Sequence, residues 1–193
     1  MLSKGMDGTE FSKHSELHEA WQDGLSIQNN WMYCLTTLKL VNCDIEPYAI
    51  PSKLFPCLKS LKILEVRSCN KVKQIFAKND TEEVPFQLNT LILEDLSKLT
   101  LDWEKKFRGI HSFQNMTHVS VIGCKSIQTL FPTVLAENLK RLEKLEVKSC
   151  DKLREIVGKE EVAKEETATK EANEVNTVFP RITILKLWNL HNL

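Results

Sequence analysis

Cysteine and histidine are the residues of this 193-residue chain whose types could support metal or nucleophilic chemistry. The six cysteines include no Cys-x-x-Cys pair, the spacing that brings two thiolates onto one zinc ion. His14 and His18 stand four residues apart, as on one face of a helix. A zinc-protease helix needs a glutamate directly after the first histidine, whereas Glu16 comes one place late. The sequence therefore predicts no metal site.

Nucleotide and acyl-transfer chemistry also lack their motifs. A phosphate-binding loop requires Gly-x-x-x-x-Gly-Lys-Ser/Thr, so that backbone amides surround the phosphate. The nearest approach places Cys124 between Gly123 and Lys125, and His118 stands where the first glycine belongs. No Gly-x-Ser-x-Gly elbow is present, and no histidine has an acidic partner at a fixed spacing. We therefore expect a chain that is not an enzyme and that carries no cofactor.

Composition narrows the class of protein further. The chain holds 26 Lys and Arg against 26 Asp and Glu, so it lacks the basic excess typical of a nucleic-acid binder. Its 42% hydrophobic content disfavours wholesale disorder. No apolar run approaches the roughly 18 residues of a membrane span, and the first residues lack the apolar core of a secretory signal. We expect a cytoplasmic protein that neither spans a membrane nor binds nucleic acid.

One aliphatic pattern occurs six times along the chain: Leu, two residues, Leu, one residue, an aliphatic, two residues, then Cys or Leu. Its second aliphatic residue recurs at steps of 26, 27, 28, 26 and 40 residues. All but the last step lie within the period of roughly 20–29 residues of leucine-rich repeats, whose core motif the pattern reproduces. The last step indicates an insertion. The six copies begin at Leu35, Leu61, Leu88, Met116, Leu142 and Ile182.

This alternation predicts the fold. Within each copy the aliphatic residues point inward and their neighbours point to solvent, and one strand cannot bury its apolar row alone. Stacked copies bury a continuous core, so we expect an α/β leucine-rich-repeat solenoid of about six repeats. Its parallel sheet should be curved, with irregular turns and short helices on the convex side. Helical spacing of apolar residues after Pro132 predicts one such helix within residues 131–142.

Four cysteines occupy the same place in their copies, just after the strand: Cys43, Cys69, Cys124 and Cys150. A free cysteine behaves as a small hydrophobic residue, which suits a position where the chain turns off the strand. We interpret these cysteines as structural, reduced thiols. Zinc binding is the alternative, but the four residues are spread over separate repeats.

The repeats divide the chain unevenly. Residues 1–30 carry no repeat and hold five acidic residues against two lysines, so we expect a loosely ordered lead-in or the remnant of a preceding repeat. Residues 31–193 form the repeat domain. Within it, residues 158–176 contain six Glu and three Lys and predict an exposed, charged insertion. This insertion could oppose the basic segment 139–154. The chain stops within a copy of the pattern, so we expect a fragment whose core continues in a longer chain.

The outward strand positions should line the concave face, a common place for a solenoid to bind its partner. They combine both charge signs with a few large apolar residues, which suits protein recognition better than a phosphate backbone. The alternative is that these charges only keep the sheet soluble. The candidate binding residues are Lys39, Glu65, Arg67, Ile92, Glu94, His118, Ser120, Ile122, Glu146, Lys148, Lys186 and Trp188.

The repeats share more of their amino-acid sequence than the general leucine-rich-repeat motif requires. Leu-Glu-Val-x-Ser-Cys occurs at 64–69 and again at 145–150, each time before a Lys- and Val- or Leu-containing turn. Cys-type copies are interspersed with copies that end Leu-x-x-Leu, and Phe-Pro occurs at 131–132 and 179–180. Residues 31–193 thus resemble the C-terminal repeats of plant coiled-coil nucleotide-binding leucine-rich-repeat (NLR) disease resistance proteins.

The resemblance implies a sensor segment of an intracellular immune receptor. In that family the repeats recognise a pathogen effector, directly or through a guarded host protein, and hold the receptor's nucleotide-binding domain inactive. This chain contains no nucleotide-binding domain, so the resemblance implies no switching activity of its own. A generic adaptor, such as a ubiquitin-ligase substrate receptor, remains the alternative, although residues 1–30 show no F-box-like segment. A degenerate product without function also stays open.

Overall fold

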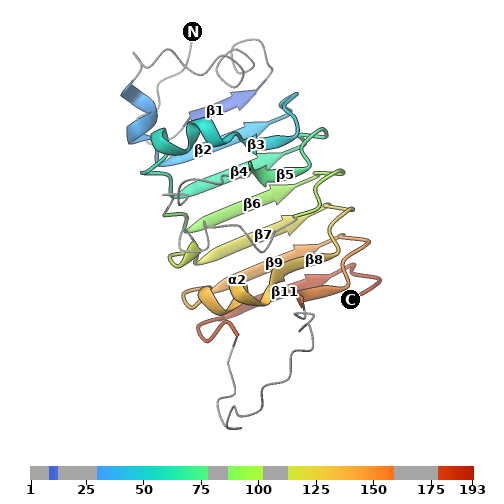
Figure 1. Ribbon diagram of the computed structural model, residues 1–193. Helices are drawn as coiled ribbons and strands as arrows, with labels where there is room; N and C mark the ends of the chain where they lie inside the picture. Colours follow the sequence, from blue (N-terminus) through green and yellow to red (C-terminus); the bar gives the residue numbers. More distant parts are fainter. Residues whose placement is uncertain (1–8, 13–29, 78–86, 102–112, 159–177) are drawn as a thin grey trace, which may run out of the picture.

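A computed structural model describes residues 9–12, 30–77, 87–101, 113–158 and 178–193. Seven parallel strands form one sheet, stacked like the rungs of a ladder (Figure 1), in the order β1-β2-β4-β6-β7-β9-β11. The strands are β1 (Thr9–Ser12), β2 (Thr37–Val41), β4 (Ile63–Arg67), β6 (Thr90–Glu94), β7 (His118–Ile122), β9 (Lys144–Lys148) and β11 (Ile184–Trp188). Six of them carry the repeated pattern, as predicted for a leucine-rich-repeat solenoid.

The strands pair residue by residue in the register that the repeats predict. Leu38 pairs with Leu64, Leu64 with Leu91 and Leu91 with Val119, although the loops between these strands differ in length. The inward residues of β2, β4, β6, β7 and β9 are at most 2% exposed. Burying each such side chain contributes about 1.5–3 kcal/mol, so the stacked aliphatic rows supply the main stabilisation of the solenoid.

Strand β1 lies within the segment for which the sequence predicts no repeat. It pairs with β2 in parallel, Phe11 opposite Leu40, and so adds a rung before the first copy of the motif. The sheet therefore begins before residue 31, within the segment that the sequence analysis describes as a lead-in or the remnant of a preceding repeat. The structure does not describe residues 1–8 and 13–29, so the prediction that the lead-in is loosely ordered stays a prediction. His14 and His18 lie among these residues.

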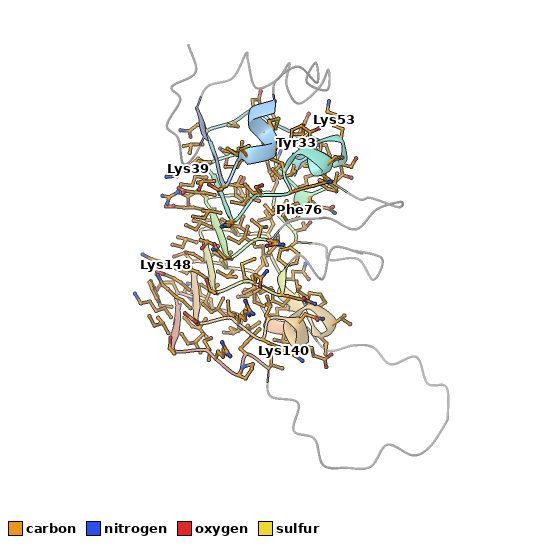
Figure 2. The ribbon with its side chains drawn as sticks, turned by 90° about the vertical axis from the view of Figure 1, so that its left-hand side faces the viewer. Tyr33, Lys39, Lys53, Phe76, Lys140 and Lys148 are labelled. Carbon is orange, nitrogen blue, oxygen red and sulfur yellow. The ribbon has the colours of Figure 1, made fainter. Side chains whose placement is uncertain are left out.

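Short elements lie on the opposite side of the core from the sheet (Figure 2). Two small parallel sheets pair β3 (Tyr48–Ile50) with β5 (Gln74–Phe76), and β8 (Thr129–Pro132) with β10 (Glu155–Gly158). The helices are η1 (Asn30–Cys34), η2 (Ser52–Cys57) and α2 (Thr133–Asn138). The last of these confirms the helix predicted within 131–142. Pro132 precedes its first turn, where a missing N–H costs no helical hydrogen bond.

Each repeat-bearing strand ends in a turn that the motif does not reveal. The residue after the strand has a positive φ in all six: Asn42 (54°), Ser68 (52°), Asp95 (53°), Gly123 (66°), Ser149 (53°) and Asn189 (55°). In the first five, its N–H donates to the carbonyl oxygen of the last strand residue of the next repeat, at 2.9 to 3.2 Å. The left-handed turn thus carries the inter-repeat hydrogen bonding one residue beyond the strand.

Candidate functional site

The structure places the twelve candidate residues on one surface. They lie on the side of the sheet that faces away from the core, which we call the open face, and they come from β2, β4, β6, β7, β9 and β11. Strand alternation explains the arrangement, because the residues between the buried aliphatics all point the other way. Figure 2 shows Lys39 and Lys148 at two levels of this side, with Phe76, Lys53 and Lys140 on the other.

Four charged residues at the N-terminal end of the open face pair with one another. Arg67 contacts Glu65 through Nε, and its Nη1 lies 2.7 Å from Oε2 of Glu94. Lys39 lies 3.6 Å from the other carboxylate oxygen of Glu65. Two positive and two negative groups thus neutralise each other across three strands.

Glu65 and Ser120 are far less accessible than their outward positions suggest. The side chain of Glu65 is only 10% exposed, because it lies between Lys39 and Ile92 of the adjacent strands and contacts Arg67 of its own strand. Ser120 is buried between its register neighbours Ile92 and Glu146, which are both longer. These two residues belong to the open face, but they offer little area to a partner.

The middle of the open face, on β6 and β7, carries two isoleucines beside the ion-paired Glu94. Ile92 lies on β6 opposite Ser120, and Ile122 ends β7, whereas His118 begins β7 between Thr90 and Lys144. Partial burial, together with the ammonium group of Lys144 on the next strand, lowers the pKa of His118. Its Nε2 atom is buried and meets no hydrogen-bond partner among the described residues. These surroundings favour the neutral form of His118, and its register neighbours Thr90 and Lys144 supply no carboxylate to act with it.

The C-terminal end of the open face is basic and aromatic. Lys144 lies 3.5 Å from Glu146, whereas Lys148 and Lys186 form no ion pair within the described parts of the chain. Their ammonium groups lie over the indole ring of Trp188, at 5.8 and 5.9 Å from its centroid. Cations at this distance from an indole face are attracted by its quadrupole and keep their charge.

The four repeat cysteines are buried and free of disulfides. The thiols of Cys69, Cys124 and Cys150 donate to main-chain carbonyl oxygens of the preceding repeat at 3.5 to 3.8 Å. Burial raises the pKa of Cys150 and raises that of Cys124 to about 12. These geometries agree with a structural role, because the thiol form is the hydrogen-bond donor. No cluster of three potential metal ligands occurs in the described ranges.

The segment that most resembles a phosphate-binding loop is a repeat turn. The N–H of Gly123 donates to the carbonyl oxygen of Lys148 at 2.9 Å, and the hydroxyl of Ser126 donates to that of Ser97 at 2.7 Å. Both groups thus form hydrogen bonds between neighbouring repeats.

The basic segment 139–154 is divided between two sides of the molecule, since Lys144 and Lys148 lie on the open face while Lys140 follows α2 on the other side (Figure 2). Its predicted contact with the acidic insertion lies outside the description.

Comparison with known proteins agrees with the architecture. The family model described as plant disease resistance protein RPS2-like, leucine-rich repeats, matches residues 7–151 and 136–193. The match thus reaches from just before β1 to the last residue of β11 and beyond. Neither the curated proteins nor the solved structures gave a match to this chain. In the part of the chain that the structure describes, no helix is long and apolar enough to cross a membrane.

Proposed function

The chain belongs to the leucine-rich repeats of plant RPS2-like disease resistance proteins, and on that basis we propose that it is the recognition module of an intracellular immune receptor. The module binds a pathogen effector, directly or through a guarded host protein. In the absence of the effector it binds the receptor's own nucleotide-binding domain and holds it inactive. It acts in the cytoplasm, without catalysis and without a cofactor.

The observation that carries this proposal is the composition of the open face. It presents ion pairs, isoleucines and an indole in one continuous surface. Protein interfaces have this character, with aromatic and aliphatic anchors among polar groups. A surface held by a regular sheet also loses little entropy when it binds, because its backbone is already ordered.

Capture by the purified 193-residue chain tests the proposal. Lysates of infected and uninfected plant tissue should each yield a defined partner, either a receptor nucleotide-binding domain or an effector with its guarded host protein. Recovery of ubiquitin-ligase subunits in their place would favour an adaptor and contradict the proposal. So would recovery of chaperones alone.

Matched variants locate the binding surface. Trp188→Ala combined with Ile122→Glu should abolish capture, since it removes one anchor and places a charge on another. The control is Lys53→Ala combined with Lys140→Ala, both exposed on the far side of the core (Figure 2). Both double variants should keep the wild-type circular dichroism spectrum. Capture that is unchanged by the first pair would place the interface elsewhere.

A further inference from the structure

Charge on the open face changes from one end to the other. At the N-terminal end, Lys39 and Arg67 are balanced by Glu65 and Glu94 through direct contacts. A charged partner gains little there, because it would have to compete with ion pairs that already exist.

At the C-terminal end the charges do not balance. Lys144, Lys148 and Lys186 share the surface with a single acid, Glu146, which pairs with Lys144. The ammonium groups of Lys148 and Lys186 therefore remain available to a ligand. Strand pairing fixes the backbone positions of these two lysines. Register places Trp188 directly opposite Lys148, so both cations lie beside one aromatic plane.

Apolar side chains border this basic end. Ile122 is the register neighbour of Lys148 on one side, and Trp188 is its neighbour on the other. Ile184, at the start of β11, is 44% exposed. A ligand that reaches the lysines therefore also covers apolar surface. This combination disfavours a phosphate backbone, which needs many cations and gains nothing from isoleucine.

We propose that the surface formed by Ile122, Lys148, Ile184, Lys186 and Trp188 binds an acidic segment of a partner protein that carries apolar side chains between its carboxylates. The proposal rests on the proposed function and specifies which part of the open face recognises the partner, and by what chemistry. Carboxylates bind Lys148 and Lys186, while apolar side chains pack on Trp188 and the isoleucines. The ion-paired N-terminal end of the open face contacts the partner by shape complementarity and does not attract it by charge.

A synthetic peptide provides the direct test. The probe is a fluorescent peptide of about 12 residues that repeats Glu-Leu-Glu, and its binding to the 193-residue chain is followed by anisotropy. Affinity should fall at least tenfold for Lys148→Glu combined with Lys186→Glu. It should also fall as salt rises from about 50 to about 300 mM, because both charges are accessible to solvent ions. A peptide that repeats Lys-Leu-Lys should not bind.

Two controls keep the test decisive. Lys53→Glu combined with Lys140→Glu makes the same charge change on the far side and should leave peptide affinity unchanged. Trp188→Ala alone should weaken binding without altering the net charge. Equal affinity in both charge-reversal variants would overturn the proposal. So would binding of RNA or anionic lipid vesicles that displaces the peptide, or binding seen only after residues 159–177 are deleted, since the chain's own acidic segment would then be the occupant.

The same variants separate this inference from the proposed function. A defined immune partner that is captured equally well by Lys148→Glu/Lys186→Glu would leave the function intact and overturn the inference. A peptide that binds as described, in a chain that captures only chaperones, would support the inference and contradict the function.

Discussion

Arg67 and Glu94 are joined across two neighbouring strands by an ion pair in which Nη1 and Oε2 lie 2.7 Å apart. The same guanidinium contacts Glu65 on its own strand, so one cation serves two carboxylates. The charge of the planar group is spread over several nitrogen atoms, so that two of them can each face a carboxylate, whereas a lysine ammonium would act as a point charge. Arg67 therefore holds β4 and β6 together on the side of the sheet that has no hydrophobic core.

Removal of this arginine should destabilise the fold. In Arg67→Met, Glu65 keeps only Lys39 at 3.6 Å, although its side chain is 10% exposed. A poorly solvated carboxylate that loses a cationic partner costs about 1–3 kcal/mol, which urea unfolding would measure. Lys125→Met removes an exposed pair with Asp151 at 3.9 Å and serves as the control. Equal losses in the two variants would show that burial of Glu65 does not matter.

The turn after each strand gives a second prediction. Gly123 has a φ of 66°, and a Cβ added there would overlap Oδ1 of Asp95. Gly123→Ala should therefore lower stability by roughly 1–2 kcal/mol, the cost of a left-handed residue, since the exposed side chain of Asp95 can turn away. Ser149→Gly, at a φ of 53°, should be neutral or stabilising by up to about 1 kcal/mol. Thermal melts that shift in the same direction for both would contradict this account of the turn.

His118 gives the fold a pH dependence of predictable sign. Burial and Lys144 lower its folded pKa below the unfolded value, so the unfolded chain binds the proton more readily. The contribution to stability is complete above the unfolded-state pKa of about 6.5 and is lost as pH falls through the lower folded value. His118→Gln should remove this decline when unfolding free energies are compared between about pH 5 and 7.5. An unchanged slope would assign the decline to other groups.

Cysteine reactivity should follow position in the repeat. Cys34 is exposed, whereas Cys69, Cys124 and Cys150 are fully buried. At pH 8 the thiol of Cys124, with a pKa of about 12, is ionised to about one part in 10⁴, so iodoacetamide reacts slowly with it even where it can enter. A hydrogen bond with Cys43 lowers the pKa of Cys69, so burial alone protects that thiol. Peptide mass spectrometry should find Cys34 labelled at least about 100-fold faster than the three buried thiols. Rapid native labelling of all three would contradict the repeat register, and in denaturant all six cysteines should react alike.

The sequence predicted the parts of the structure that repeat. A period-two row of aliphatic residues has one way to bury itself in a stack, so strands, register and the outward residues of each strand could be assigned. The short helix α2 was predictable because Pro132 and the apolar spacing agreed. β1 was missed because Thr9, a polar residue, occupies the position of the second aliphatic residue of the motif, opposite Leu38. Its only signal was a short alternating segment.

Other features depend on neighbours that the motif does not specify. The residues of the positive-φ turn are Asn, Ser, Asp and Gly, a set that shares tolerance of the left-handed region and could have indicated it. Burial of Glu65 and Ser120 follows from the lengths of the side chains on adjacent strands, which only the paired register reveals. The contact between Lys148 and Trp188 likewise joins residues 40 positions apart.

The unequal loops have a consequence for how such a chain can change. β9 and β11 pair as regularly as β2 and β4, although the step between them is 40 residues rather than 26. Each strand is held by hydrogen bonds to its neighbour in the stack, so strand pairing does not depend on the length of chain that connects the two strands. Insertions and deletions between strands can accumulate in a lineage while every outward residue keeps its neighbours. Point substitutions on the open face and length changes between the strands are thus independent routes by which repeats of this kind can diverge.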